Sequence, residues 1–160
     1  MFGVHCSRGW ASERPDSVWD VADTEILIQL RWADMDINNH INNVQIARLF
    51  EESRVRSFAQ WLSQPQVVPS MVLARQDIEF RAVLEYSIEP VRVCSRVTRL
   101  GRSSFAMGLT LFAPDGQVCA YAESTLVNLD GTGRPSPLTD AMRDTLAERL
   151  GEPLPFQRPN

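Results

Sequence analysis

The chain contains no lysine, because all 16 of its basic residues are arginines. This absence excludes Schiff-base catalysis and the lysine of a P-loop. Only two histidines are present, His5 and His40, so a histidine-rich metal site within one chain is excluded. Any Ser–His–Asp or Cys–His device would have to use one of them. The GxGxxG and GxSxG patterns of dinucleotide sites and of many hydrolases are also missing.

Cysteine is scarce as well. The chain has three cysteines, which are Cys6, Cys94 and Cys119. Their odd number and wide spacing favour neither a disulfide framework nor a zinc site. We expect Cys94 and Cys119 to be small buried residues. The sequence thus predicts no metal ion.

The chain lacks both a basic surface and a long apolar run. Its net charge is −4, which argues against nucleic acid as a partner. No run of about 18 apolar residues predicts a membrane helix, and the N-terminus lacks the apolar core of a signal peptide. With 44% hydrophobic and 22% charged residues, the composition is typical of a soluble domain. We therefore expect one cytoplasmic domain without a membrane partner.

The first part of the chain predicts an arm, a strand and a long helix. Residues 1–24 are polar without a clear period and predict a loosely ordered arm. Residues 26–32 carry large apolar side chains at every second position, which predicts a strand with at least one buried face. From 43 to about 62 apolar residues, beginning with Val44, recur at helical spacings. Asn42 is the expected N-cap with Gln45 completing a capping box, and Gln64-Pro65-Gln66 ends the helix.

The rest of the chain predicts four consecutive strands. Their expected ranges are 67–83, 88–98, 104–112 and 118–129, followed by a short helix at 139–150 and a proline-rich tail. Short turns between consecutive strands favour antiparallel pairing. A single long apolar helix must be covered, so the sheet should wrap around it. The fold class is therefore α+β, with an antiparallel sheet of about five strands wrapped around one long central helix.

A turn between the first strand and the long helix carries the most chemistry. Asp36 lies on this turn, close to the start of the helix. A carboxylate beside exposed backbone N–H groups can attack a polarised carbonyl, or deprotonate a water molecule that does so. Spacing alone favours a loop-capping carboxylate for Asp36. For Asp34, two residues earlier, a surface or turn-capping role is expected.

Three segments resemble the hot-dog-fold thioesterases of the 4-hydroxybenzoyl-CoA thioesterase type. They are DINNHINN at 36–43, FEESR at 50–54 and GRSSF at 101–105. The resemblance covers roughly residues 25–130, which would form the hot-dog domain. The arm at 1–24 and the short helix and tail at 131–160 lie outside it. Asn39 replaces the usual glycine of the turn, and asparagine is the next most tolerant residue of positive φ. The resemblance implies a hot-dog fold that hydrolyses an acyl-CoA thioester to a carboxylic acid and free CoA, without a cofactor.

The resemblance also implies roles for individual residues. Asp36 would be the nucleophile or general base, and the backbone amide of Asn43 would polarise the thioester carbonyl. His40 would orient groups at the site or, more often in such turns, hydrogen-bond the backbone to hold the loop. A second branch of the family carries its carboxylate on the helix, which makes Glu51 the alternative catalytic residue. Otherwise Glu51 and its neighbour Glu52 form surface ion pairs with nearby arginines, Arg48 or Arg54.

Arg99, Arg102 and Ser103 lie near a predicted turn that looks like the family's CoA entrance. Arginine suits bidentate phosphate contacts, although a solvated turn explains these residues equally well. The resemblance implies a homodimer or homotetramer acting on acyl-CoA or on an acyl carrier protein. Two alternatives remain open on the same fold: an enoyl-CoA hydratase using Asp36, Asn38 and His40, and a non-catalytic acyl-CoA-binding module.

Overall fold

The computed structural model describes residues 23–62 and 70–157. Most of the predicted arm 1–24, the helix end at 64–66 and the start of the predicted strand 67–83 lie outside these residues. The elements, in chain order, are β1 (Thr24–Ile28), the 3₁₀ helix η1 (Trp32–Asp34), α1 (Asn43–Trp61), β2 (Met71–Phe80), β3 (Val91–Leu100), β4 (Ser104–Phe112), β5 (Val118–Asn128) and α2 (Asp140–Ala147).

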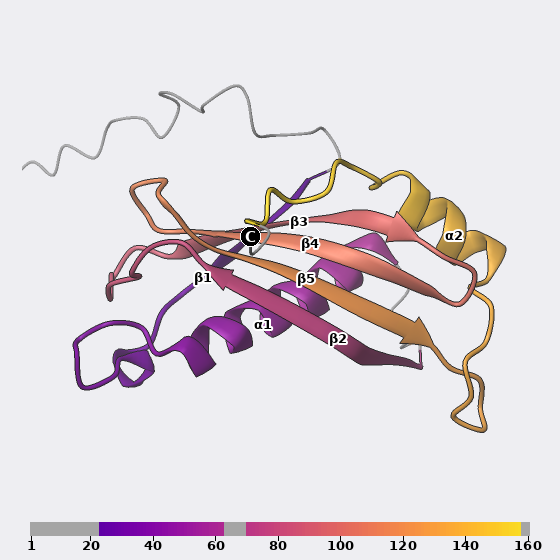
Figure 1. The fold of residues 1–160 in the computed structure, drawn as a ribbon, viewed down its shortest axis with the longest axis horizontal. Coiled ribbons are helices and arrows are strands. Elements are labelled where there is room, and N and C mark those ends of the chain that lie inside the picture. Colours follow the sequence, from indigo (N-terminus) through magenta and orange to yellow (C-terminus); the bar gives the residue numbers. More distant parts are fainter. Residues whose placement is uncertain (1–22, 63–69, 158–160) are drawn as a thin grey trace, which may run out of the picture.

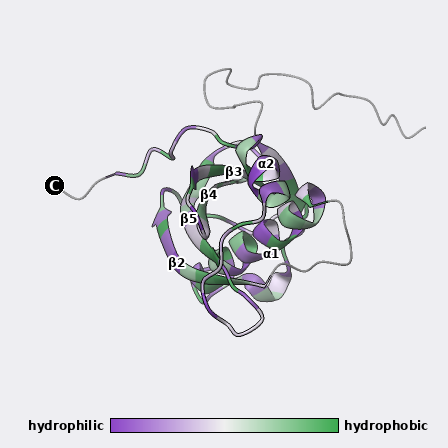
Figure 2. Cartoon of the chain, turned by 90° about the vertical axis from the view of Figure 1, so that its right-hand side faces the viewer, coloured by the Kyte–Doolittle hydropathy of each residue, from purple (hydrophilic) through white to green (hydrophobic). Residues whose placement is uncertain are grey.

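The five strands form one antiparallel sheet in the order β1-β3-β4-β5-β2. The sheet curves around α1, so the long helix lies on its concave side (Figures 1 and 2). This arrangement confirms the predicted α+β hot-dog fold. Because β2 is hydrogen-bonded only to β5, it forms one edge of the sheet.

The layer between α1 and the sheet holds the core. On β4, the predicted apolar face is confirmed, because Phe105, Met107, Leu109 and Leu111 all belong to the core cluster, whereas Gly108 on the other face meets Leu154 of the tail. From α1, Leu49 and Phe50 pack into the same cluster. Burial of such side chains contributes roughly 1.5–3 kcal/mol each to folding.

The start of α1 differs from its prediction in two details. Asn42 is the N-cap as expected, and its side-chain oxygen accepts the Val44 N–H at 2.9 Å. The predicted capping box with Gln45 is wrong, because the Gln45 side chain accepts from Arg48 instead. Val44 is 71% exposed and lies about 200° around the helix from the buried Ile46, so it does not belong to the apolar face.

The strand predicted for 26–32 is too long. β1 ends at Ile28, and the chain then bends into η1, where Trp32 is exposed and packs edge-on against Tyr86 with 5.5 Å between ring centroids. The strand predicted to reach residue 83 likewise ends at Phe80. The chain after β2 turns toward the helix start, and Leu84 accepts the Ile41 N–H at 2.8 Å.

The C-terminal helix α2 packs against the core beside β3, where Leu146 is fully buried, and the tail after it reaches the outer side of the sheet. After α2, Arg149 places its guanidinium 5.5 Å from the centre of the Trp61 ring, and its carbonyl accepts the Val97 N–H. The tail then brings Leu154 against Gly108, where any Cβ would lie 2.9 Å from the Leu154 Cγ. Glycine at this position therefore allows the tail to lie close to the sheet.

Both described cysteines are buried, as predicted. Burial raises the pKa of the Cys94 thiol to about 12 and raises the pKa of Cys119. Within 23–62 and 70–157, no helix combines the length and apolar character needed to cross a membrane.

Candidate active site

A tight turn holds Asp36 at the entrance to α1. Met35 and Ile41 form an isolated antiparallel bridge, the Asp36 N–H donates to the His40 carbonyl at 2.8 Å, and the Asn39 N–H donates to the Asp36 carbonyl at 3.1 Å. Asn39 has a φ of 60°. This is the left-handed conformation for which glycine is preferred and asparagine is tolerated, so the turn forms without its usual glycine.

The Asp36 carboxylate caps this turn with one oxygen. Its Oδ1 accepts the N–H groups of Asn38 at 2.7 Å and of His40 at 3.4 Å. Its Oδ2 has no hydrogen-bond partner among the residues that the structure describes. The side chain is half-buried and lines a cavity of about 320 Å³. The loop-capping role is therefore present, and it leaves the other oxygen of this cavity-lining residue available for another task.

The cavity brings together three of the predicted site residues. Its walls are Asp36, His40, Ile41, Asn43, Ile46 and residues 80–84. The wall residues come from the turn, from the first turn of α1 and from the chain at the end of β2. A carboxylate and a helix N-terminus thus line one space, together with His40, with Arg81, which pairs with Glu79, and with apolar side chains.

Asn43 is the first residue of α1, and its N–H has no hydrogen-bond partner in the described part of the chain. The neighbouring donors are satisfied, since the Val44 N–H bonds the Asn42 side chain and the Ile46 N–H bonds the Asn42 carbonyl. The first N–H groups of a helix carry a partial positive charge. A carbonyl oxygen placed against the Asn43 N–H would be polarised.

His40 holds the turn through its backbone rather than through its ring. Its carbonyl and N–H both bond Asp36, and it forms an isolated antiparallel bridge with Glu85. No hydrogen bond of the imidazole is found within the described ranges. The ring is left to line the cavity, so the expected loop-holding role belongs to the main chain.

For Asp34, the predicted surface position is wrong and the predicted turn-capping role is confirmed, because its carboxylate caps η1 by accepting the Arg31 N–H. It is fully buried rather than on the surface, and its carboxylate accepts the Arg31 N–H and side chain at 2.7–2.9 Å and the Arg48 Nη2 at 3.1 Å. Burial alone would raise its pKa, but the hydrogen bonds from Arg31 and the charges of Arg48 and Arg31 hold the pKa below its ordinary value. The spacing of three residues between Arg31 and Asp34 is the sequence pattern from which their ion pair could have been predicted.

Asp34 also connects the turn to the helix. Its carbonyl accepts the Asn42 N–H at 2.9 Å, directly before the first residue of α1. Through Asp34, the end of the first strand segment, the turn and the helix start form one hydrogen-bonded unit. This unit fixes where the Asn43 N–H lies relative to Asp36.

The alternative carboxylate Glu51 lies elsewhere. It is exposed on α1, about 12 Å along the helix from Asn43, and it is not part of the cavity wall. The neighbouring Glu52 makes the predicted surface ion pair with Arg48 at 3.1 Å and a second one with Arg56 at 3.5 Å. Within one chain, Asp36 is the carboxylate that faces the cavity.

The predicted CoA contacts are at the other end of the sheet. Arg99, Arg102 and Ser103 lie at or beside the β3–β4 turn, whereas the Asp36 turn lies beyond the far end of β2 (Figure 1). β2 has 10 residues and spans about 30 Å between these ends. A single chain therefore does not bring these residues to the Asp36 cavity.

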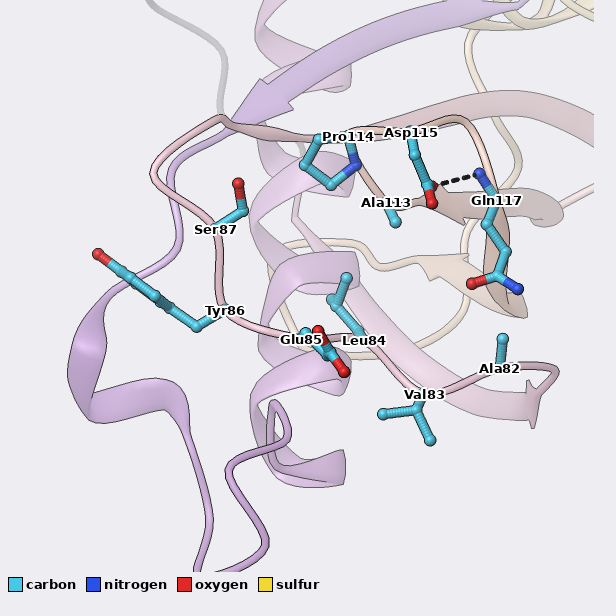
Figure 3. A pocket seen from close by; sticks show the side chains of 10 residues that line it. All are labelled: Ala82, Val83, Leu84, Glu85, Tyr86, Ser87, Ala113, Pro114, Asp115 and Gln117. Atoms are coloured by element: carbon cyan, nitrogen blue, oxygen red, sulfur yellow. Dashed lines mark hydrogen bonds between the residues drawn. The ribbon is translucent and has the colours of Figure 1, made fainter.

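A second, larger cavity of about 530 Å³ lies beside the first. It opens between residues 82–87 and the β4–β5 turn at 113–117, which are drawn in Figure 3. Its charged residues are Glu85 and Asp115, and Asp115 caps the turn by accepting the Gln117 N–H at 2.9 Å. None of the predicted catalytic groups lines it, and its acidic character disfavours phosphate.

The described residues contain no cluster of three or more His, Cys, Asp or Glu side chains that could hold a metal ion. The Asp36 carboxylate and the N-terminus of α1 lie in the wall of the same cavity. Such a pair can activate a nucleophile at one side of a carbonyl and stabilise an oxyanion at the other.

The chain is similar to known proteins of one family. The model of the thioesterase-like superfamily matches residues 30–148. A predicted thioesterase from Bacillus stearothermophilus is 28% identical, with a TM-score of 0.73 over 82% of this chain and 98% of its own. A thioesterase from Thermus thermophilus, solved with coenzyme A and Zn, is 30% identical, with a TM-score of 0.70 over 81% and 96%.

A more distant structure shares the fold. A 1,4-dihydroxy-2-naphthoyl-CoA thioesterase from Synechocystis is 16% identical, with a TM-score of 0.69 over 78% of this chain and 96% of its own. Among curated proteins, no sequence matches the chain.

Proposed function

Because the chain belongs to the thioesterase-like superfamily, we propose that it hydrolyses an acyl-CoA thioester to a carboxylic acid and free CoA. One observation carries this proposal. The cavity has the Asp36 carboxylate and the Asn43 N–H in its wall, and both retain an open hydrogen-bonding position among the described residues. The Thermus thioesterase that was solved with coenzyme A supports CoA as the carrier.

The proposed reaction needs only these two groups and water. The thioester oxygen accepts the Asn43 N–H, which stabilises the oxyanion as it forms and is worth about 3 kcal/mol of barrier. Asp36 takes a proton from water, the hydroxide adds to the carbonyl carbon, and the C–S bond breaks. The departing thiolate takes up the proton. Alternatively, Asp36 itself adds to the carbon and the C–S bond breaks to release the thiolate. Water then hydrolyses the mixed anhydride to the acid, which frees Asp36, and the proton from water goes to the thiolate.

We further propose that two copies complete the site, in a homodimer or in a homotetramer built from such dimers. The free edge of β2 exposes unpaired backbone groups and apolar side chains such as Val72 and Leu73. If two β2 strands pair antiparallel, the β3–β4 turn of one copy comes to the same end of the joined sheet as the cavity of the other. Arg99 and Arg102 would then be available to CoA phosphates across the interface.

The test is thiol release from a panel of acyl-CoAs and acyl carrier proteins, with chains of different length and with aromatic groups. The proposal expects one free thiol for each acid formed. Loss of enoyl absorbance without thiol release would instead indicate a hydratase. Saturable binding of acyl-CoA without turnover of any panel member would indicate a non-catalytic module. Either outcome would contradict the proposed function.

A further inference from the structure

Arg54 is a buried charge that the proposed mechanism does not use. It lies near the middle of α1 and is only 6% exposed, whereas the sequence suggested a surface ion pair. Its one hydrogen bond in the described chain is a long one, from Nη1 to the Ser124 hydroxyl at 3.4 Å. Glu51 acts on it electrostatically, but no described carboxylate lies within ion-pair distance of it. Buried charges in proteins are normally paired, but this guanidinium has no counter-ion among the residues that the structure describes.

A second unsatisfied donor lies beside it. Gln76 on β2 is directly opposite Ser124 on β5, so both side chains project from the same face of the sheet, about 5 Å apart. The Gln76 Nε2 is buried without a hydrogen-bond partner among the described residues. Buried polar atoms are rarely left unsatisfied. A guanidinium, an amide and a hydroxyl can all donate here, so the missing group is an acceptor, and the positive charge favours an anion.

The position of this cluster relates it to the thioester site. Along β2, Gln76 is four residues before Phe80, which lines the Asp36 cavity, a separation of about 13 Å. Between these two levels, the buried residues that β5 presents are the small Ala120 and Ala122. An acyl chain that starts in the cavity and follows this face would end beside Arg54.

We propose that Arg54, Ser124 and Gln76 bind the far end of the acyl group, and that the preferred substrates carry a carboxylate there. This inference rests on the proposed thioesterase function. A carboxylate can take two parallel hydrogen bonds from the guanidinium and a further one from the Gln76 amide. Arg54 is already buried within one chain, which favours a slender acyl chain over a side chain from a second copy.

The test compares two CoA thioesters of equal length, octanoyl-CoA and its ω-carboxylated counterpart suberyl-CoA, together with shorter and longer pairs. For the wild type, kcat/KM is expected to favour the carboxylated member by about 10- to 100-fold at the matching length. The Arg54→Met variant should lose this preference while still hydrolysing octanoyl-CoA. Arg56→Met is the matched control, because Arg56 is exposed on the same helix and bonds Glu52 and the Leu27 carbonyl.

Gln76→Leu provides a second test if Arg54→Met does not fold, and should reduce the preference several-fold. A wild type that favours the methyl-terminated member at every length overturns the proposal, and the thioesterase assignment then stands. An unchanged preference in Arg54→Met, with a changed mass in light scattering, also overturns it and assigns Arg54 to a contact between copies. If no thioester is hydrolysed, calorimetry compares the affinities of the wild type for octanoyl-CoA and suberyl-CoA. Equal affinities would overturn the proposal.

Discussion

Asp34 and Asp36 are two residues apart, yet the regions around them differ in almost every physical respect. The Asp34 carboxylate is fully buried and receives hydrogen bonds from Arg31 and Arg48. The Asp36 residue is half-buried, lines a cavity and uses one carboxylate oxygen to cap its turn. Two identical side chains in one turn therefore have different roles: Asp34 fixes the helix start, and Asp36 keeps one oxygen free to react.

The largest effect is expected for Asp36→Asn. Asparagine keeps an oxygen that can accept the Asn38 and His40 N–H groups, so the turn and the melting temperature should change little. It cannot serve as base or nucleophile, so kcat should fall by at least about 100-fold. Rates of thiol release and thermal melts of the same preparations measure both. A variant with full activity would show that Asp36 is only a turn cap.

Asp34→Asn should reverse this pattern. The new amide group would face the guanidinium groups of Arg31 and Arg48 without an acceptor, which costs about 2 kcal/mol of unfolding free energy. Urea unfolding measures this loss. Activity should fall much less than in Asp36→Asn wherever the protein remains folded. If the two variants lose stability equally, the proposed division between the aspartates is wrong.

The stability of the wild type should depend on pH through Asp34. Its pKa is lower in the folded chain than in the unfolded chain, so its contribution is present above about pH 4 and is lost as the pH falls through the folded value. Urea unfolding of wild type and Asp34→Asn at pH 7 and at decreasing acidic pH measures the difference. The difference in unfolding free energy between wild type and Asp34→Asn should become smaller as the pH falls. A difference that stays constant would show that the ionised Asp34 carboxylate does not cause it.

The smallest effect is expected for Glu51→Gln. Glu51 is exposed and lies outside the cavity wall, so kcat/KM should remain within about two-fold of the wild type. The thiol-release assay that is used for Asp36→Asn serves here too. A loss comparable to that of Asp36→Asn would move the catalytic carboxylate from the turn to the helix.

Sequence patterns predicted the parts of the fold that local physics determines. The alternation of 104–112 matches β4 in full, and the Asn42 cap marks the start of α1 correctly. The turn was predictable because Asn39 tolerates the positive φ that it adopts. These features depend on residues close together in the chain.

The errors concern contacts that no local pattern reveals. The strand predicted for 26–32 ends early because the Asp34 carboxylate bonds the Arg31 main chain and bends it. Arg54 looked like half of a helix-surface ion pair, yet it faces Ser124, 70 residues away. The distance of Arg99 and Arg102 from Asp36 within one chain likewise follows from the strand order, which no local pattern contains, and their contact with CoA stays a prediction.

A structure of the protein with a non-hydrolysable acyl-CoA analogue would show directly whether Asp36 and Asn43 act on the same carbonyl group. We expect the analogue's carbonyl oxygen about 2.9 Å from the Asn43 nitrogen, with the adjacent carbon facing the free oxygen of Asp36. An acyl group bound instead in the larger cavity beside Glu85 and Asp115, with Asp36 directed into solvent, would contradict this expectation.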